Sequence, residues 1–228
     1  MIDVAVSGEA VAVTAADTVV GVLLAGGRSR RMFMDGPGTG DKGLLDIDGR
    51  PMLAHVVERI RPQVRALVLN ANGDPARFAR FGLPLVADTI AGHVGPLAGV
   101  LAGMRWAAAN VPSASHVATV STDAPFVPAD LVARLARALA ASASGERIAL
   151  ARSDGNLHPV IGLWPVSLAD DLEGALQDGV RKVLAWTDRH GTLPVDFESV
   201  SIGGELVDPF FNANTPDELA EARRRLAS

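Results

Sequence analysis

The sequence contains no cysteine, and this absence removes several kinds of chemistry at once. Disulfide bonds, thiolate zinc sites, iron–sulfur clusters and cysteine nucleophiles are all excluded. Tyrosine is absent too, and seven phenylalanines and three tryptophans do not favour an aromatic platform for single-stranded nucleic acid. The formal net charge is −5 without a block of lysine and arginine, which argues against duplex nucleic acid as a partner. These absences favour a small-molecule substrate.

Long hydrophobic runs are missing as well. A membrane-spanning helix needs roughly 20 apolar residues, and Arg134 and Arg137 interrupt one of the richest stretches. The first nine residues carry two acidic side chains and no basic one, whereas a secretory signal begins with positive charge. We therefore expect a cytoplasmic protein that does not bind a membrane.

The 228 residues, 48% of them hydrophobic, suffice for one domain with its own core. We expect a weakly structured extension over residues 1–17 and a single domain over 18–228. Continuous apolar runs, typical of parallel strands covered on both faces, alternate with segments of helical periodicity. The expected strands are 19–24, 66–69, 84–87, 117–120, 148–150 and 160–163, and helices are expected after Pro51, over 97–108, after Pro128 and after Pro216. This order predicts an α/β fold, a doubly wound, Rossmann-like three-layer α/β/α sandwich with a mostly parallel sheet.

A glycine-rich segment follows the first expected strand. Leu24-Ala25-Gly26-Gly27 leads to Arg31, and Asp41-Lys42-Gly43 comes after a further loop. Paired glycines let a backbone approach a nucleotide closely, while arginine and lysine place positive charge beside phosphates. The combination indicates a nucleotide-binding segment.

Two nucleotide-binding patterns nearly match here and are rejected. The segment Gly38–Gly43 has the spacing G-x-G-x-x-G, yet it neither follows a strand directly nor opens a helix. A P-loop needs glycine, lysine and serine or threonine in succession, but Asp41 separates Gly40 from Lys42.

Polar residues stand at the carboxyl ends of three expected strands, where open parallel sheets bind ligands. Asp123 and Asp88 follow two of them, and Asn70 ends a third. A carboxylate there can hold a magnesium ion that bridges triphosphate oxygens, although an aspartate also caps helices and forms Asx turns. Asn70 offers both a donor and an acceptor to a base or ribose. From the pattern alone, both interpretations of each aspartate remain open.

Four of the five histidines predict no separate metal site. His55, His93, His116 and His190 show no metal-ligand spacing among themselves. We interpret all four as structural or solvent-facing.

The motifs form an ordered set along the chain: Leu24-Ala25-Gly26-Gly27, Arg31-Met32, Asp41-Lys42-Gly43, Asn70-Ala71-Asn72, Asp88, Gly95-Pro96-Leu97-Ala98-Gly99, Asp123-Ala124-Pro125-Phe126 and Asn212-Ala213-Asn214-Thr215-Pro216. This set resembles the MobA-like nucleotidyltransferases, and within them most closely the guanylyltransferases of molybdenum cofactor biosynthesis. The resemblance covers nearly everything after residue 18. It implies the nucleotide-diphospho-sugar transferase type of sandwich.

The resemblance also implies a reaction: GMP is transferred from GTP to molybdopterin (Mo-molybdopterin) with release of pyrophosphate, and Mg²⁺ is the cofactor. It implies catalytic roles for Lys42 and Arg31 near the phosphates and for Asp123 as the magnesium ligand. The residues implied to contact or enclose the nucleotide are Leu24, Ala25, Gly26, Gly27, Asn70, Asp88, Gly95 and Gly99. Those implied to lie near the pterin acceptor are His158, Asn212 and Asn214. Transient contact with molybdoenzymes or other cofactor-biosynthesis proteins is expected.

One segment departs from the family pattern. The loop 33–40 is several residues longer than the family's, and it could act as a lid or bulge into solvent.

The alternative within the same chemistry is a cytidylyl- or other nucleotidyltransferase acting on a different phosphorylated small molecule. A nicotinamide-dependent oxidoreductase would need the missing glycine fingerprint, and a nonenzymatic partner protein would bind GTP without turnover.

Overall fold

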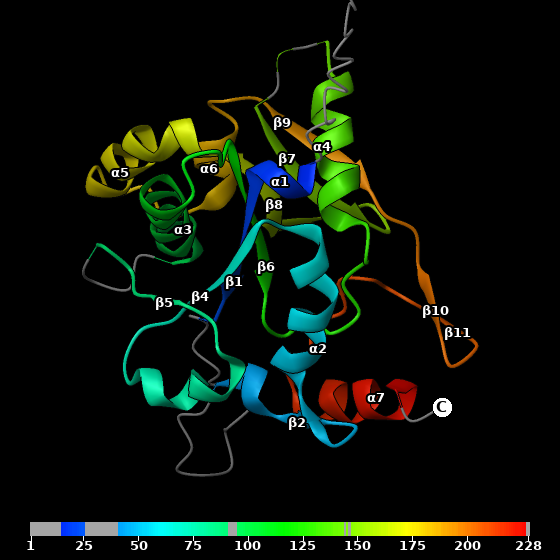
Figure 1. Cartoon of the computed structure of the whole chain (residues 1–228). Helices are drawn as coiled ribbons and strands as arrows, with labels where there is room; N and C mark the ends of the chain where they lie inside the picture. The colour runs from blue at the N-terminus through cyan, green and yellow to red at the C-terminus, as the bar shows by residue number, and fades with distance from the viewer. Residues whose placement is uncertain (1–14, 26–40, 91–94, 144, 146, 227–228) are drawn as a thin grey trace, which may run out of the picture.

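Figure 1 shows the computed structural model, which describes residues 15–25, 41–90, 95–143, 145 and 147–226. The strands are β1 Val19–Leu24, β2 Asp46–Ile47, β3 Arg50–Pro51, β4 Ala66–Asn70, β5 Leu85–Val86, β6 His116–Ser121, β7 Ile148–Ser153, β8 Asn156–Pro165, β9 Thr192–Asp196, β10 Val200–Ile202 and β11 Glu205–Val207. The α-helices are α1 Ala15–Thr18, α2 Met52–Ile60, α3 Pro96–Asn110, α4 Leu131–Ala141, α5 Ala169–Gln177, α6 Val183–Thr187 and α7 Pro216–Leu226. Short 3₁₀ helices are η1 Lys42–Leu44, η2 Arg61–Gln63, η3 Pro75–Phe81 and η4 Val166–Leu168.

Seven strands form one sheet in the order β5-β4-β1-β6-β8-β7-β9. β5, β4, β1 and β6 are parallel neighbours, and β7 pairs with β9 in parallel. β8 is antiparallel to both of its neighbours, β6 and β7. The mostly parallel sheet predicted from the apolar runs is therefore confirmed.

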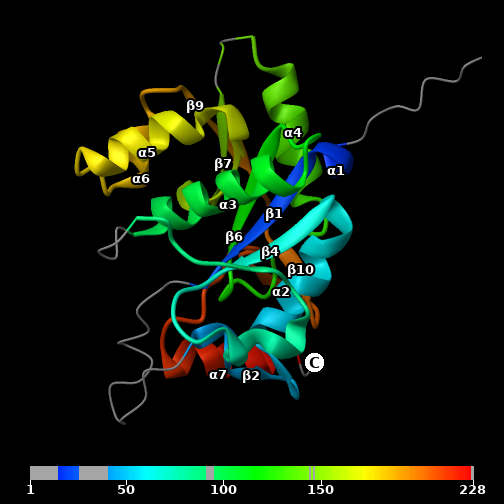
Figure 2. The ribbon, with the colours of Figure 1, turned by 60° about the vertical axis from the view of Figure 1, so that its left-hand side comes forward.

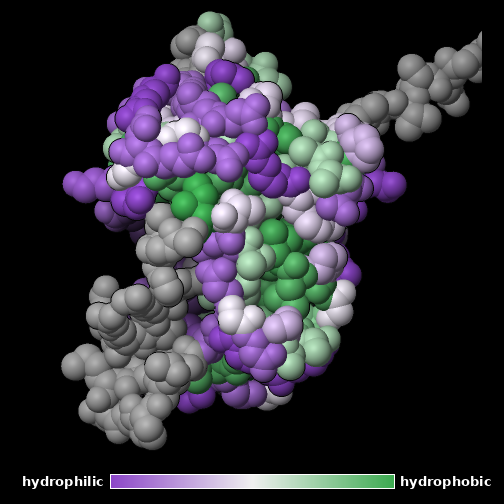
Figure 3. Space-filling model, turned by 90° about the vertical axis from the view of Figure 1, so that its left-hand side faces the viewer, coloured by the Kyte–Doolittle hydropathy of each residue, from purple (hydrophilic) through white to green (hydrophobic). Residues whose placement is uncertain are grey.

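Two hydrophobic cores lie on opposite faces of this sheet. Side chains alternate along a strand, so Val19 and Leu23 of β1 pack with α2 and α4, whereas Val20 and Val22 pack with α3, α5 and α6. Figures 1 and 2 show these two groups of helices on either side of the sheet. The predicted three-layer sandwich is confirmed. Figure 3 faces the α3–α5 side, whose upper part is mainly hydrophilic.

A third, smaller core joins the C-terminal part of the chain to the body. It includes Ile47 of β2, Met52 of α2, Phe126, Val207 of β11 and Leu219 of α7. A capping box starts α7: the Glu218 amide donates to Thr215 Oγ1 (3.2 Å), and the Thr215 amide donates to Glu218 Oε2 (2.9 Å). This packing brings the loop before α7 back to the carboxyl end of β6.

The structure adds elements that the sequence pattern did not predict. They include α5, α6, β9, the β10–β11 hairpin and the short 3₁₀ helices. Most of the expected extension 1–17 lies outside the described residues, but its end forms α1, which packs against α4. In the described part of the chain, no helix is long and apolar enough to cross a membrane.

Candidate active site

Several predicted site residues lie close together because three parallel strands end side by side. In the sheet register Leu24, the last residue of β1, pairs with Asn70 of β4 and with Ser121 of β6. The residues that follow these strands therefore share one edge of the sheet. This is the edge at which ligands bind in open parallel sheets.

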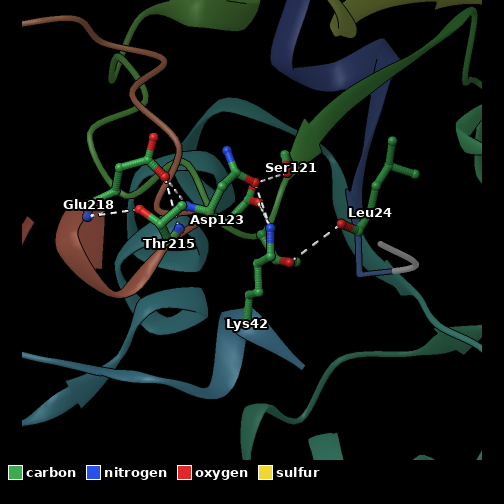
Figure 4. Close-up of polar contacts among 8 residues, drawn as sticks. Leu24, Lys42, Ser121, Asp123, Thr215 and Glu218 are labelled. Atoms are coloured by element: carbon green, nitrogen blue, oxygen red, sulfur yellow. Dashed lines mark hydrogen bonds and ion pairs between the residues drawn. The ribbon is translucent and has the colours of Figure 1, made fainter. Parts of the chain in front are cut away.

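Lys42, Asp123 and Asn214 converge at this edge from three separate segments. Lys42 Nζ donates to Asn214 Oδ1 at 2.5 Å and lies 3.8 Å from Asp123 Oδ2. Ser121 Oγ donates to the other carboxylate oxygen of Asp123. Figure 4 shows Lys42 directed toward Asp123. The side chains of Lys42 and Asp123 are only 16% and 15% exposed, so solvent screens their interaction weakly.

Local backbone contacts place these three side chains. Gly43 packs on Thr122, since a Cβ added at Gly43 would lie 3.0 Å from Thr122 Cβ. Thr122 in turn donates from its amide and from Oγ1 to the Leu24 carbonyl, each at 3.4 Å. On the third segment, the Asn214 amide donates to Glu218 Oε2 at 2.8 Å. The lysine, the aspartate and the asparagine are thus fixed relative to the end of β1.

Asn70 and Asp88 form a second polar group on the other side of β1. Asn70 Nδ2 donates to the Val86 carbonyl (3.1 Å) and to Asp88 Oδ1 (3.0 Å). Asn72 Nδ2 donates to Asp88 Oδ2 at 2.8 Å, and Asn72 Oδ1 accepts from the Asp88 amide at 3.0 Å. Two asparagines therefore hold the carboxylate of Asp88 at the sheet edge.

Two of the predicted glycines, Gly95 and Gly99, shape the space beside Asn70 and Asp88. Gly95 stands before the first turn of α3 with φ of +84°, a backbone conformation that favours glycine. Gly99 lies one turn further on, where an added Cβ would collide with Asn70 Oδ1 and come within 2.7 Å of Leu24 Cδ2. The Ala25 amide donates to the Asn70 carbonyl at 2.9 Å. Glycine at residue 99 lets α3 approach the ends of β1 and β4.

His158 lies in β8, and Asn212 lies in the loop between β11 and α7. His158 Nε2 is 2.7 Å from Ser153 Oγ, which donates to Asp208 Oδ1 at 2.8 Å. The His158 ring packs on Phe210 with 4.7 Å between ring centroids. Burial lowers the pKa of His158, opposed by the charge of Asp208. Asn212 Oδ1 is buried and has no hydrogen-bond partner among the described residues.

The arginine Arg77 of η3 was not predicted as a site residue, yet it contacts the lysine-bearing segment. Its guanidinium forms an ion pair with Asp41, the residue before Lys42. Burial raises the pKa of the Asp41 carboxyl, and the charge and hydrogen bond of Arg77 oppose that rise. No local sequence signal identifies this pairing, since 36 residues separate the two side chains.

Three predicted residues lie outside the described part of the chain: Gly26, Gly27 and Arg31. The long loop 33–40 lies outside it as well. Their predicted contacts with the nucleotide and its phosphates stay predictions.

A cavity of about 470 Å³ lies at the opposite end of β1 and β6. Its walls are mostly apolar and include Val19, His116 and Leu163. None of the predicted site residues lines it, and the convergence of polar groups at the carboxyl ends remains the better candidate for the chemistry.

Comparison with known proteins identifies the family. The MobA-like NTP transferase domain matches residues 21–192, which include the segments that carry Lys42, Asn70, Asp88 and Asp123. The chain belongs to the MobA-like NTP transferase family. This confirms the predicted family and the predicted enzyme class, nucleotidyltransferase.

Relatives within the family carry a more specific name. A molybdenum cofactor guanylyltransferase of Bradyrhizobium sp. (strain ORS 278) is 51% identical over 210 residues, covering 92% of this chain and 93% of the relative. One of Rhizobium meliloti (strain 1021) is 48% identical over 202 residues, covering 88% of each chain. These relatives thus belong to the molybdenum cofactor branch, which is the branch that the motifs of this chain resemble.

Solved structures of MobA-like and related proteins share the fold. A molybdopterin-guanine dinucleotide biosynthesis protein A from Archaeoglobus fulgidus has a TM-score of 0.66 at 23% identity, covering 90% of this chain and 97% of its own. A Mycobacterium tuberculosis protein solved in complex with manganese has a TM-score of 0.60 at 18% identity, covering 91% of this chain and 98% of its own. These likenesses establish the architecture of the sandwich.

Proposed function

We propose that this chain transfers GMP from GTP to the terminal phosphate of Mo-molybdopterin and forms molybdopterin guanine dinucleotide. The observation that carries the proposal is the convergence of Lys42, Asp123 and Asn214 beside the end of β1, with Asn70 and Asp88 across it. The relatives named molybdenum cofactor guanylyltransferase, at about 50% identity over most of both chains, support the choice of substrates.

The nucleoside is bound beside β4 and α3 in this proposal. Asp88 is held by two asparagine amides, and its remaining acceptor positions suit the N–H groups of guanine or a ribose hydroxyl. Gly95 and Gly99 leave room at the start of α3, while Leu24 and Ala25 form the adjoining backbone. Contacts of Gly26 and Gly27 with the nucleotide stay predictions.

The reaction needs positioning and charge compensation more than a strong base. An oxygen of the acceptor's terminal phosphate, already an anion, attacks the α-phosphorus of GTP. A new P–O bond forms, the bond from the α-phosphorus to the bridging oxygen breaks, and pyrophosphate leaves with that oxygen. Lys42, with Arg31, balances the negative charge that spreads over the phosphate oxygens in such a transfer.

The side chains around Asp123 fit a magnesium ion. Mg²⁺ takes one or two carboxylates together with phosphate oxygens and water, rather than a cage of protein ligands. Asp123 is a largely buried carboxylate that stands after the carboxyl end of β6, 3.8 Å from Lys42 Nζ, so it offers one carboxylate at the place proposed for the phosphates. Asp123 would therefore hold the ion, which supplies charge neutralisation to the triphosphate when bound.

The acceptor is proposed to lie on the side of Asn214, where His158 and Asn212 stand. The unpartnered, buried Oδ1 of Asn212 can accept an N–H of a pterin ring. His158 is fixed by Ser153 and Phe210, so it presents a rigid edge. A cytoplasmic location and transient contacts with molybdoenzymes stay predictions.

Product analysis tests the proposal. Purified protein is incubated with Mg²⁺, Mo-molybdopterin and GTP labelled at the α-phosphorus. We expect the label in a dinucleotide with the mass of molybdopterin guanine dinucleotide and no label in pyrophosphate. A labelled dinucleotide formed only when CTP carries the α-phosphorus label, or only with another phosphorylated acceptor, would replace the proposed substrates.

A further inference from the structure

Arg77 connects two segments of the proposed site. Its Nη1 is ion-paired with Asp41 Oδ2, its Nη2 donates to the Asn72 carbonyl at 2.5 Å, and its Nε donates to the Asp74 carbonyl at 2.9 Å. The guanidinium also lies 5.1 Å from the ring centroid of Phe78. A planar fork with several donors, stacked on an aromatic ring, is geometry that lysine cannot reproduce in full.

Each end of this bridge continues into the site. On one side, Asp41 directly precedes Lys42, and its carbonyl accepts from the Leu44 amide at 3.0 Å to close the η1 turn. On the other side, Asn72 binds the amide and the carboxylate of Asp88. A continuous chain of contacts therefore runs from the proposed nucleoside ligand Asp88 to the proposed phosphate ligand Lys42.

We propose that Arg77 is a positioning residue that holds Lys42 in register with the nucleoside-binding loop 70–72. The inference rests on the proposed function and deepens it. Asp41 is 16% exposed, and its carboxylate stands one residue from the lysine. By occupying that carboxylate, Arg77 keeps Asp41 from drawing Lys42 away from Asn214 and Asp123. Without Arg77 the lysine segment loses its anchor to the nucleoside loop and gains a competing anion.

Three variants separate this role from a general effect on folding. Arg77→Met keeps the apolar stem and removes the fork, and Arg77→Lys restores only the charge. Arg80→Met is the matched control, because Arg80 lies in the same 3₁₀ helix and stacks over the following phenylalanine, with 5.3 Å to the ring centroid of Phe81. All three are compared with the unmodified chain by thermal denaturation and by kcat and KM for GTP at saturating Mo-molybdopterin.

We expect Arg77→Met to lower kcat by about 10- to 100-fold, because small misplacement of a catalytic group has effects of that size. We expect KM for GTP to rise less than kcat falls, Arg77→Lys to recover part of kcat, and Arg80→Met to stay within about twofold of the unmodified chain. A lower melting temperature with unchanged kcat would overturn the positioning role. So would an equal loss of kcat in Arg77→Met and Arg80→Met.

A double-mutant cycle with Asp41→Asn tests the route through Asp41. If Arg77 acts through this carboxylate, adding Arg77→Met to Asp41→Asn lowers kcat much less than it does in the unmodified chain. Fully additive losses would overturn the route.

Should the unmodified chain release no pyrophosphate with any triphosphate, the proposed function fails, and calorimetric binding of GTP to these variants then tests the inference alone. Weaker binding by Arg77→Met than by Arg80→Met supports it, and equal binding, or none by any form, overturns it.

Discussion

Replacing Gly99 by alanine perturbs the proposed nucleoside pocket through a single methyl group. The added Cβ would collide with Asn70 Oδ1 and approach Leu24 Cδ2 to 2.7 Å. Asn70 cannot easily turn away, because its Nδ2 is bound to the Val86 carbonyl and to Asp88. Relief of the collision therefore moves Asn70, α3 or both, and the hydrogen bond to Asp88 is lost or lengthened.

The magnitude follows from overpacking and from the lost hydrogen bond. Overpacking costs about 1–3 kcal/mol of unfolding free energy. For a chain of this size each kcal/mol lowers Tm by about 2–4 °C. An Asp88 that Asn70 no longer holds loses its proposed hydrogen bond to bound GTP; a hydrogen bond to a charged group contributes about 1.5–3 kcal/mol, which corresponds to about a 10- to 150-fold loss in GTP affinity.

Two other glycines supply matched controls. A Cβ at Gly103, one turn further along α3, would lie 2.5 Å from Val22 Cγ2, so Gly103→Ala also displaces α3 but strikes the core. A Cβ at Gly174 in α5 meets nothing within 4 Å, so Gly174→Ala is expected to gain about 0.5–1 kcal/mol of helix stability. Only Gly99→Ala strikes Asn70.

The assay combines thermal denaturation with calorimetric binding of GTP to the three variants. We expect Gly99→Ala and Gly103→Ala to lose stability, and Gly99→Ala to lose far more GTP affinity than Gly103→Ala. If Gly99→Ala bound GTP as tightly as the unmodified chain while its Tm fell, Asn70 and Asp88 would not form the nucleoside pocket.

Three further predictions concern charges. Lys42→Met lowers kcat by about 100- to 1,000-fold, as expected when one preorganised donor to a developing charge is removed; stopped-flow or steady-state pyrophosphate release measures it, and an unchanged kcat contradicts the phosphate role. Asp123→Asn keeps the side-chain volume and abolishes turnover at all Mg²⁺ concentrations with Tm nearly unchanged, whereas full recovery at high Mg²⁺ would favour another ligand. Burial lowers the pKa of His116 below its ordinary 6.5. As the pH falls below 6.5, the unfolded chain therefore binds the proton before the folded chain does, and the unfolding free energy decreases. Urea titrations from pH 7 to 5 should give a flatter curve for His116→Gln, and an identical slope would contradict the sign.

The sheet was predictable because its central strands are buried on both faces. β1 and β4 are built from apolar runs, and β6 has three apolar residues around Thr119; β4 ends at Asn70 and β6 at Ser121, two residues before Asp123. Their parallel order follows from the helices between them, and it places the strand ends together. The convergence of Asn70 and Asp123 at one edge therefore follows from pattern and topology alone.

Other elements have too weak a hydrophobic pattern to be predicted from the sequence. β9 contains Pro194, which weakens any strand signal. The β10–β11 hairpin has three residues in each strand and leaves Leu206 77% exposed, so almost no hydrophobic alternation marks it. Helix α5 is short and buries small residues such as Ala169 and Ala175 beside its leucines.

Polar contacts between residues far apart in the chain could not be predicted from the sequence either. The Arg77–Asp41 ion pair and the Ser153–Asp208 hydrogen bond join side chains 36 and 55 residues apart, and neither pair belongs to a recurring spacing. Lys42 was identified by its motif, but its contact with Asn214 depends on the small core that docks α7. Such contacts are decided by tertiary packing rather than by local propensity.

Guanylyl transfer is tested most directly by measuring pyrophosphate release from the purified chain with Mg²⁺ and Mo-molybdopterin, given GTP, CTP, ATP and UTP in turn. The proposed guanylyl transfer predicts release with GTP and none above background with the other three. Release with CTP instead would contradict the base choice, and silence with all four would contradict nucleotidyl transfer to this acceptor.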